Sequence, residues 1–177
     1  MAKGKGKGSQ WERDIAKYLT KWLTGQDKEY YFWRSPGSGS IGTVTQCNID
    51  LHGDIIPIKP EAEFFCNIWC IECKNGYGSA SLDKHLKSNK NDHIQDFWEQ
   101  TVNNSIPHGK NPMLIFKKKG NPAWIGVNNK IQSILYTYLE TLNFIHLRWN
   151  YEILDCYFFD MKDFFEKITP EIIKERL

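Results

Sequence analysis

The sequence predicts an α/β fold, with a central mixed sheet of about four or five strands and helices on both faces. Runs rich in aromatic and β-branched residues alternate along the chain with segments whose apolar residues recur at helical spacing. The 177 residues suffice for a sizeable core, and no linker or internal repeat divides them. We therefore expect a flexible basic tail over residues 1–8 and a single domain over residues 9–177.

The composition indicates the compartment of the protein and the kind of surface with which it could bind nucleic acid. There is no apolar run of the roughly 18 residues that a membrane helix needs, and the basic N-terminus lacks the apolar stretch of a secretion signal. Most of the five cysteines fall in apolar runs, which predicts reduced core thiols in a cytoplasmic protein. The net charge is only +2, so any surface for nucleic acid has to be local.

Residues 1–8 alternate lysine with glycine, and a segment of this composition cannot build a core. We expect it to be solvated in the free protein. Its cations, which include Lys5 and Lys7, could also follow DNA phosphates and become ordered on binding. The two interpretations are compatible with each other.

The first predicted helix begins at Ser9 and ends at Gly25. Ser9 and Glu12 fit an S-x-x-E capping box, in which the Glu12 side chain bonds the first amide of the helix. That is a complete structural explanation of Glu12, and a catalytic role is the alternative. The helix is indicated by apolar residues at helical spacing, namely Trp11, Ile15, Tyr18, Leu19, Trp22 and Leu23.

A short aromatic strand over residues 29–34 leads into a loop of glycine and serine. Residues 37–42 match the G-x-G-x-x-G pattern of dinucleotide-binding folds. That pattern requires a helix directly afterwards, whereas residues 43–47 are β-branched and poor in helix formers, which excludes a Rossmann fold. A loop whose amides and hydroxyls meet a phosphate remains plausible, with Arg34 beside it.

Two further strands are predicted, over residues 49–58 and 64–74. Asp54 falls in an apolar part of the first, and Glu72 and Lys74 project from one side of the second while Cys73 faces the other. A hairpin would bring the three charged side chains together, as a site for a hard cation and a water molecule. A structural ion pair between Glu72 and Lys74 is the alternative.

Cysteine and histidine residues near this strand raise the question of zinc. Cys66 and Cys70 lie inside the predicted strand rather than on the turns that carry structural zinc ligands, so we expect no zinc site. The residues weighed for it are Cys47, His52, Cys66, Cys70, Cys73 and His85.

The second half of the chain supplies the rest of the predicted sheet. A polar loop over residues 75–92 carries Lys84, Lys87 and Lys90 and could face DNA. Then come a helix from about residue 94, strands over 112–116 and 122–127 joined by a basic turn, a helix over 129–141, strands near 143–149 and 152–159, a helix capped by Asp160 and a last helix from Pro170.

Four short motifs then follow one another in a distinctive order over roughly residues 5–76. They are Lys7-Gly8 with Glu12, Arg34-Ser35-Pro36-Gly37-Ser38, Gly53-Asp54-Ile55-Ile56 and Ile71-Glu72-Cys73-Lys74. Together they resemble the PD-(D/E)XK nuclease superfamily, most closely its branch of archaeal and phage Holliday junction resolvases. Two departures are Gly53 in place of proline and a longer segment between Arg34 and Asp54.

The resemblance implies a restriction-endonuclease-like core that hydrolyses DNA phosphodiesters with Mg²⁺, for which Mn²⁺ would substitute. Asp54, Glu72 and the carbonyl of Cys73 would hold the metal, and Glu12 would contact the metal or its water. Lys74 would orient or deprotonate the attacking water. Glu12, Asp54, Glu72 and Lys74 are thus the predicted catalytic residues.

The resemblance also implies a substrate, which is branched DNA in the form of a four-way junction, cut by a homodimer in a prokaryotic, archaeal or phage-infected cell. Gln100 resembles a glutamine that follows the E-x-K strand in many of these nucleases. Two alternatives stay open: a restriction-like or phage-type endonuclease, and an inactive DNA-binding module. The predicted DNA-binding residues are Lys5, Lys7, Arg34, Ser35, Ser38 and Gln100.

Overall fold

The computed structural model of the chain describes residues 5–35, 52–75, 93–149 and 155–177, and the side chains from Gly8 onward. In order, the elements are α1 (Lys5–Thr24), β1 (Phe32–Arg34), β2 (Ile55–Pro57), the 3-10 turn η2 (Pro60–Ala62), α2 (Glu63–Ile68), β3 (Trp69–Asn75), α4 (His93–Ser105), η3 (Ile106–His108), β4 (Asn111–Lys117), β5 (Ala123–Val127), α5 (Asn129–Ile134), α6 (Tyr136–Leu139), β6 (Phe144–Leu147), β7 (Cys156–Asp160), α7 (Met161–Lys167) and α8 (Pro170–Arg176).

The centre of the fold is a mixed five-stranded sheet in the order β3-β4-β5-β7-β6. Strands β3 and β4 run parallel, with α4 as the helix between them in sequence, and the other pairs are antiparallel. The short antiparallel ribbon of β1 and β2 lies beside β3, where the Asp54 amide donates a 2.7 Å hydrogen bond to the carbonyl of Ile71. The predicted α/β fold with a central mixed sheet is confirmed.

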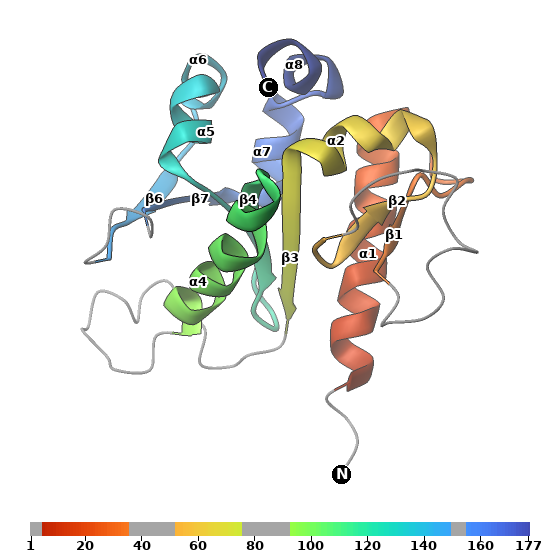
Figure 1. Cartoon of the computed structure of the whole chain (residues 1–177), viewed down its shortest axis with the longest axis horizontal. Coiled ribbons are helices and arrows are strands. Elements are labelled where there is room, and N and C mark those ends of the chain that lie inside the picture. Colours follow the sequence, from red (N-terminus) through yellow and green to blue (C-terminus); the bar gives the residue numbers. More distant parts are fainter. Residues whose placement is uncertain (1–4, 36–51, 76–92, 150–154) are drawn as a thin grey trace.

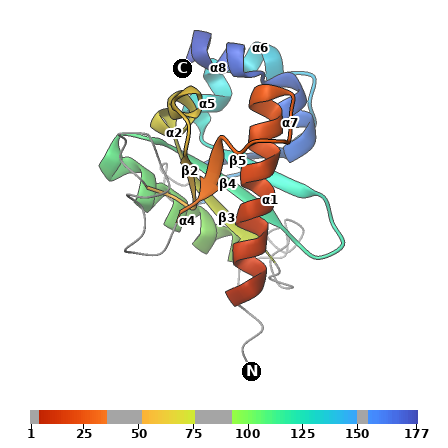
Figure 2. The same cartoon turned by 90° about the vertical axis from the view of Figure 1, so that its right-hand side faces the viewer.

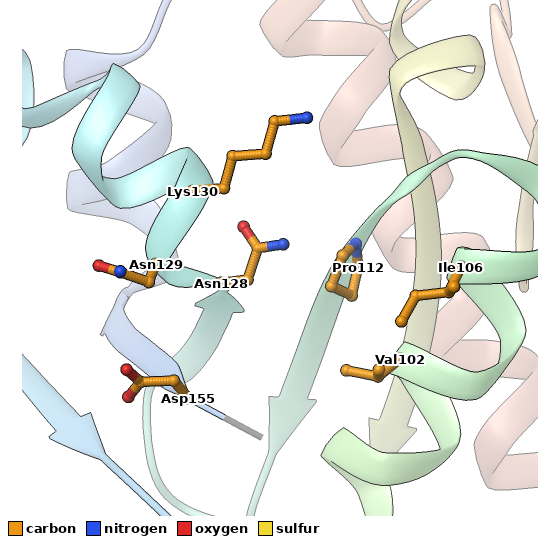
Figure 3. A pocket seen from close by; sticks show the side chains of 7 residues that line it. All are labelled: Val102, Ile106, Pro112, Asn128, Asn129, Lys130 and Asp155. Atoms are coloured by element: carbon orange, nitrogen blue, oxygen red, sulfur yellow. The ribbon is translucent and has the colours of Figure 1, made fainter. Parts of the chain in front are cut away.

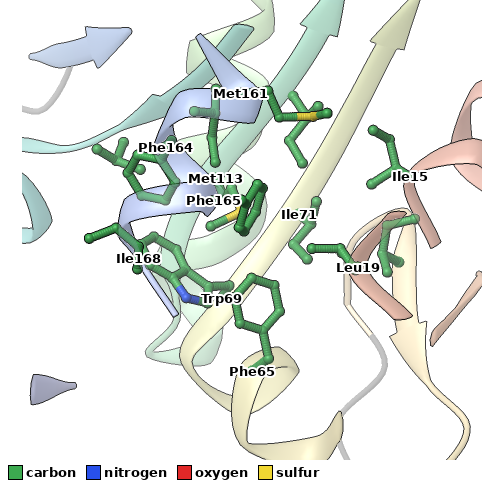
Figure 4. Close-up of a cluster of buried hydrophobic side chains, with 14 of the residues drawn as sticks. Ile15, Leu19, Phe65, Trp69, Ile71, Met113, Met161, Phe164, Phe165 and Ile168 are labelled. Carbon is green, nitrogen blue, oxygen red and sulfur yellow. The ribbon is translucent and has the colours of Figure 1, made fainter. Parts of the chain in front are cut away.

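Helices cover both faces of this sheet, because each strand alternates two apolar faces (Figure 1). On β4, Leu114 and Phe116 pack with α4, while Met113 and Ile115 belong to the larger cluster on the other side. Figure 4 shows that larger cluster, which α1, α2 and α7 close over β3 and β4. Fully burying one such side chain contributes about 1.5–3 kcal/mol, so both faces of β3 are firmly fixed.

Gly53 sets the approach of the β2 segment to β3. Its φ is +96°, and a Cβ atom there would lie 2.8 Å from the carbonyl oxygen of Ile71. Only glycine combines this backbone conformation with so close a contact. Proline, whose ring fixes φ near −65°, could not take this position, which accounts for one departure from the resembled motif.

The structure corrects the predicted strand over residues 64–74. Its first part is the helix α2, and β3 begins only at Trp69. Short apolar runs do not distinguish a buried strand from a buried helix, and here Pro60 starts a helical turn that continues into α2. No hairpin joins the Asp54 segment to β3. Strand β2 pairs with β1 instead, and the predicted strand over 49–58 is reduced to Ile55–Pro57 in the described residues.

The start of the first helix is also different from the prediction. Helix α1 begins at Lys5, so Ser9 lies inside the helix and is not its N-cap. The capping box predicted for Glu12 is therefore wrong. The predicted end is confirmed, since Gly25 has a φ of +71° and its amide bonds the carbonyl of Lys21.

In the described residues from 93 onward the predicted order of helices and strands is confirmed with shifted boundaries. The helix expected over residues 129–141 is two short helices, α5 and α6. Asp160 caps α7 by accepting from the amides of Lys162 and Asp163, as predicted. Among the described segments, none of the helices combines the length and apolar character needed to span a bilayer.

Candidate active site

Strand β3 presents the two charged side chains of the E-x-K motif on one face. Glu72 and Lys74 are two residues apart and lie on the α4 side, and the Lys74 ammonium is 2.6 Å from Oε1 of Glu72. The same ammonium lies 5.7 Å from the ring centroid of Phe97 on α4. Glu72 is only 5% exposed, so its charge depends on these neighbours for compensation.

Asp54 is attached to the edge of the same strand by two backbone contacts. Its amide donates to the Ile71 carbonyl, and its Oδ2 accepts a 2.8 Å hydrogen bond from the amide of Cys73. Its own carbonyl accepts a 2.7 Å hydrogen bond from the amide of Ser35, just after β1. The Asp54 carboxylate is thus fixed beside the E-x-K motif without the predicted hairpin.

Burial and the neighbouring carboxylates together set the electrostatics of Asp54. Burial, followed by the charge of Glu72, raises the pKa of Asp54 to about 7, although the Cys73 amide opposes the rise. The charge of Glu12 also raises this pKa, and that of Lys74 lowers it. Three carboxylates therefore interact across a partly desolvated space, where Lys74 pairs with Glu72 and Arg34 pairs with Glu12.

Glu12 reaches this space from α1. Its Oε2 lies 3.4 Å from Nη1 of Arg34, which is also 3.4 Å from Oγ of Ser9. Gly8 lies one turn earlier beside Glu12, and a Cβ atom there would make only an ordinary contact, 3.8 Å from Oε1 of Glu12. Glu12 therefore faces Arg34 and the carboxylate group rather than the amides at the start of the helix.

Helix α4 holds the Glu72 carboxylate from the other side. Nε2 of Gln100 donates to Oε1 of Glu72 at 3.1 Å, and Nδ2 of Asn104 donates to Oε2 at 3.4 Å. Gln100 and Asn104 are four residues apart, so they share one face of the helix. Asn104 is not among the residues predicted from the sequence, and its spacing from Gln100 was the signal that could have identified it.

A comparison with protein families identifies the family of this chain. The family model described as "Phage putative PDDEXK endonuclease" matches residues 3–175, which is almost the whole chain. The chain belongs to this family. Comparisons with curated proteins and with solved structures found no match. The five-stranded mixed sheet with its flanking helices agrees with the restriction-endonuclease-like fold that the resemblance implied.

Nucleases of the PDDEXK type use divalent metal ions. A member of this family should therefore offer side-chain or backbone oxygen atoms that can hold such an ion. In the part of the chain that the structure describes, no three His, Cys, Asp or Glu side chains form a group that could hold a metal. Mg²⁺, however, commonly takes one or two carboxylates together with waters and substrate phosphate oxygens. Asp54 and Glu72, whose charges repel, are the hard oxygen donors that such an ion prefers.

Cys73 could serve such an ion only through its carbonyl. Burial, then the charges of Asp54 and Glu72, raise the pKa of its thiol well above the ordinary value, so the sulfur stays protonated. Of the residues weighed for zinc, Cys47 and His85 lie outside the described residues, and Cys66 and Cys70 are buried thiols.

The predicted DNA-binding residues are only partly described. Arg34 pairs with Glu12, and Gln100 bonds Glu72. Ser35 is described through its amide, which bonds the Asp54 carbonyl. Ser38, the side chains of Lys5 and Lys7, and the predicted basic loop with Lys84, Lys87 and Lys90 fall outside the described residues.

A cavity of about 240 Å³ lies away from this group (Figure 3). Pro112, in its wall, pairs with Cys70 near the start of β3, whereas Lys74 lies near the end of that strand. The cavity therefore opens at the opposite end of the parallel strand pair from the E-x-K motif. It is lined by Val102, Ile106, Pro112, Asn128, Asn129, Lys130 and Asp155.

Proposed function

We propose that this protein hydrolyses phosphodiester bonds of DNA as an endonuclease that depends on Mg²⁺, with Mn²⁺ as a substitute. The observation that carries the proposal is the contact of Asp54 with β3. The Cys73 amide holds the Asp54 carboxylate beside Glu72 and Lys74, on a chain whose family is one of endonucleases. A charged group this crowded is costly in a structural role and is typical of a catalytic one.

Asp54, Glu72 and the Cys73 carbonyl would hold the metal ion. When bound, the ion supplies positive charge against the scissile phosphate and lowers the pKa of a coordinated water. Asp54 keeps its orientation through the Cys73 amide, and Glu72 keeps its own through Gln100 and Asn104. The charge of Glu72, which adds to burial in raising the pKa of Asp54, favours occupation of this place by a cation.

Lys74 and Glu12 have roles that follow from where their polar atoms lie. The Lys74 ammonium, 2.6 Å from Glu72, can donate a hydrogen bond to an attacking water or to a phosphate oxygen whose charge grows as the bond to phosphorus forms. Glu12 adds a carboxylate on the α1 side, and Arg34 holds it there. Glu12 would accept a hydrogen bond from water bound to the metal.

The finer substrate preference is part of the proposal. Resemblance in the motifs favours a structure-selective resolvase that acts as a homodimer on four-way junctions. The name of the matching family favours the second candidate, a phage-type endonuclease on the same core. An inactive DNA-binding module is the least favoured, because Glu12, Asp54, Glu72 and Lys74 are all present.

A cleavage assay on labelled junction, flap, nicked and plain duplex DNA tests the proposal. Cutting in Mg²⁺ or Mn²⁺ that a chelator stops supports it, and selective cutting of junctions near the branch point supports the resolvase. Equal cutting of plain duplex would favour the phage-type endonuclease instead. Absence of cutting on every substrate with either ion would overturn the proposed activity. Activity with Zn²⁺ alone would favour a zinc site that includes the cysteines instead.

A further inference from the structure

The turn between β4 and β5 carries three consecutive lysines, Lys117, Lys118 and Lys119. Lys117 still pairs with Ala123 in the β4–β5 ladder. Beyond that pair the Asn121 amide bonds the carbonyl of Lys118 at 3.0 Å, and Gly120 takes a φ of +82°. A bonded turn with glycine at its third position is a short, well-defined structure, and at its tip Lys119 is exposed and Lys118 half-buried.

The register of the sheet brings this turn to the end of β3 that carries the E-x-K motif. Strands β3 and β4 are parallel, so their C-terminal ends share one edge, and Lys74 pairs with Phe116 while Asn75 pairs with Lys117. Neighbouring strands lie about 5 Å apart, which makes the turn the adjacent element to the proposed catalytic lysine. Figure 2 shows the β4–β5 connection projecting beyond α1 at this side of the molecule.

Asp54 and the lysine turn flank the end of β3 from opposite sides. Asp54 bonds β3 along the edge that β4 does not occupy. Phe116 faces α4, so Lys117, one residue further, faces α1, where its ammonium lies 5.5 Å from the ring centroid of Trp11. Trp11 directly precedes Glu12 in α1. A DNA backbone that crosses the end of β3 from Asp54 toward β4 would therefore meet this turn.

Two of the three charges of the turn, those of Lys118 and Lys119, are not neutralised by a carboxylate of the described residues, whereas Lys117 lies over the Trp11 ring. Lys74 pairs with Glu72, and Lys162 with Glu166. Across the described ranges, by contrast, no carboxylate forms an ion pair with Lys118 or Lys119. Three adjacent cations repel one another, and a polyanion that neutralises them would gain from the release of its counterions.

We infer that Lys117, Lys118 and Lys119 bind the phosphate backbone of DNA next to the scissile position. The inference rests on the proposed function, because it takes DNA as the substrate of the neighbouring site. It adds a binding element that lies outside the four resembled motifs and depends on backbone phosphates rather than on base sequence. A solvated turn without a partner is the alternative outcome.

Binding of a labelled DNA duplex, measured by fluorescence anisotropy over a range of salt concentrations in chelator, tests this. Each lost phosphate contact reduces the log–log salt slope by about 0.9, so the double variant Lys118→Ala with Lys119→Ala should flatten the slope by about 1.8. The matched control is Lys130→Ala with Lys167→Ala. It removes the same charge from two exposed positions in α5 and α7, at the other end of the molecule (Figure 1).

A wild-type slope in the turn variant, or an equal change in the control, would overturn the inference. If the double variant does not fold, the exposed Lys119→Ala alone should lower the slope by about 0.9. Cleavage is measured separately. Wild-type protein that binds DNA but never cuts it would overturn the proposed function and leave the turn assignment standing, whereas wild-type protein without salt-dependent binding would overturn both.

Discussion

The amide of Cys73 donates a 2.8 Å hydrogen bond to Oδ2 of Asp54. This bond joins the edge of the central sheet to a segment that pairs with a different strand, β1. Glu72 and Lys74 flank Cys73 in sequence, so one backbone amide sets the position of Asp54 relative to both. Disturbing the bond should therefore affect the site without dismantling the sheet.

Gly53→Ala should destabilise the protein and displace Asp54. Its φ of +96° disfavours a Cβ atom, and that atom would also lie 2.8 Å from the Ile71 carbonyl. We expect a cost of about 2–4 kcal/mol, measured by denaturant unfolding, with loss of cleavage. Gly25→Ala is the control, since its φ is +71° with nothing within 4 Å of the added atom, and it should cost about 1 kcal/mol. Equal costs would show that the contact with Ile71 is unimportant.

The raised pKa of Asp54 predicts a pH dependence of stability. The folded state binds this proton more tightly than the unfolded state, so without a divalent ion stability should fall as pH rises from the ordinary aspartate pKa of 3.8 to about 7. Asp54→Asn should remove this part of the decline. Melting temperatures of both proteins in chelator, over that pH range, measure it. Parallel curves would contradict the burial and repulsion assigned to Asp54.

Glu12→Gln separates a catalytic role from a structural one. The Glu12–Arg34 contact is partly exposed, so its loss should cost at most about 1 kcal/mol of stability. If Glu12 accepts from metal-bound water, cleavage should fall by about 10²-fold or more. Single-turnover cleavage and a melting curve, measured on the same preparation, distinguish the catalytic role of Glu12 from the structural one. Full activity in this variant would remove Glu12 from the site.

Asn104→Ala tests whether α4 orients the Glu72 carboxylate. Loss of its 3.4 Å hydrogen bond to Oε2 should raise the Mg²⁺ concentration needed for half-maximal cleavage by about 10-fold or more, because partners that orient a metal ligand tune its affinity. Asn103→Ala, at the adjacent exposed position on the same helix, is the control and should behave as wild type. A change in melting temperature with an unaltered Mg²⁺ requirement would indicate a purely structural contact.

Much of the fold could be predicted because apolar periodicity is a local signal. Strands β4, β5 and β7 follow from it, and the caps at Gly25 and Asp160 follow from the residue types that end and begin helices. The region before β3 could not be predicted, because a short apolar run such as 64–71 suits a buried helix as well as a buried strand. The true start of α1 was hidden by glycines at 4, 6 and 8, which disfavour a helix on propensity alone.

The residues of the candidate site that belong to the ordered motifs could be predicted from the sequence. The contacts that form only in the folded chain could not. The resemblance singled out Asp54, Glu72 and Lys74, and alternation along a strand gave the common side of Glu72 and Lys74. It could not show that Asp54 reaches β3 through a backbone amide rather than through a hairpin. The contact of Asn104 with Glu72 could not be predicted from the sequence either, because the two residues are 32 positions apart.

The proposal that Asp54 is required for cleavage of DNA is tested most directly by a comparison of Asp54→Asn with Asp27→Asn. Single-turnover cleavage of labelled DNA in Mg²⁺ is measured for both variants. Both variants remove one carboxylate charge, Asp54 from beside β3 and Asp27 from an exposed loop after α1. We expect Asp54→Asn to abolish cleavage while binding DNA as tightly as wild type or more tightly, and we expect Asp27→Asn to cleave normally. Wild-type cleavage by Asp54→Asn would contradict the proposal.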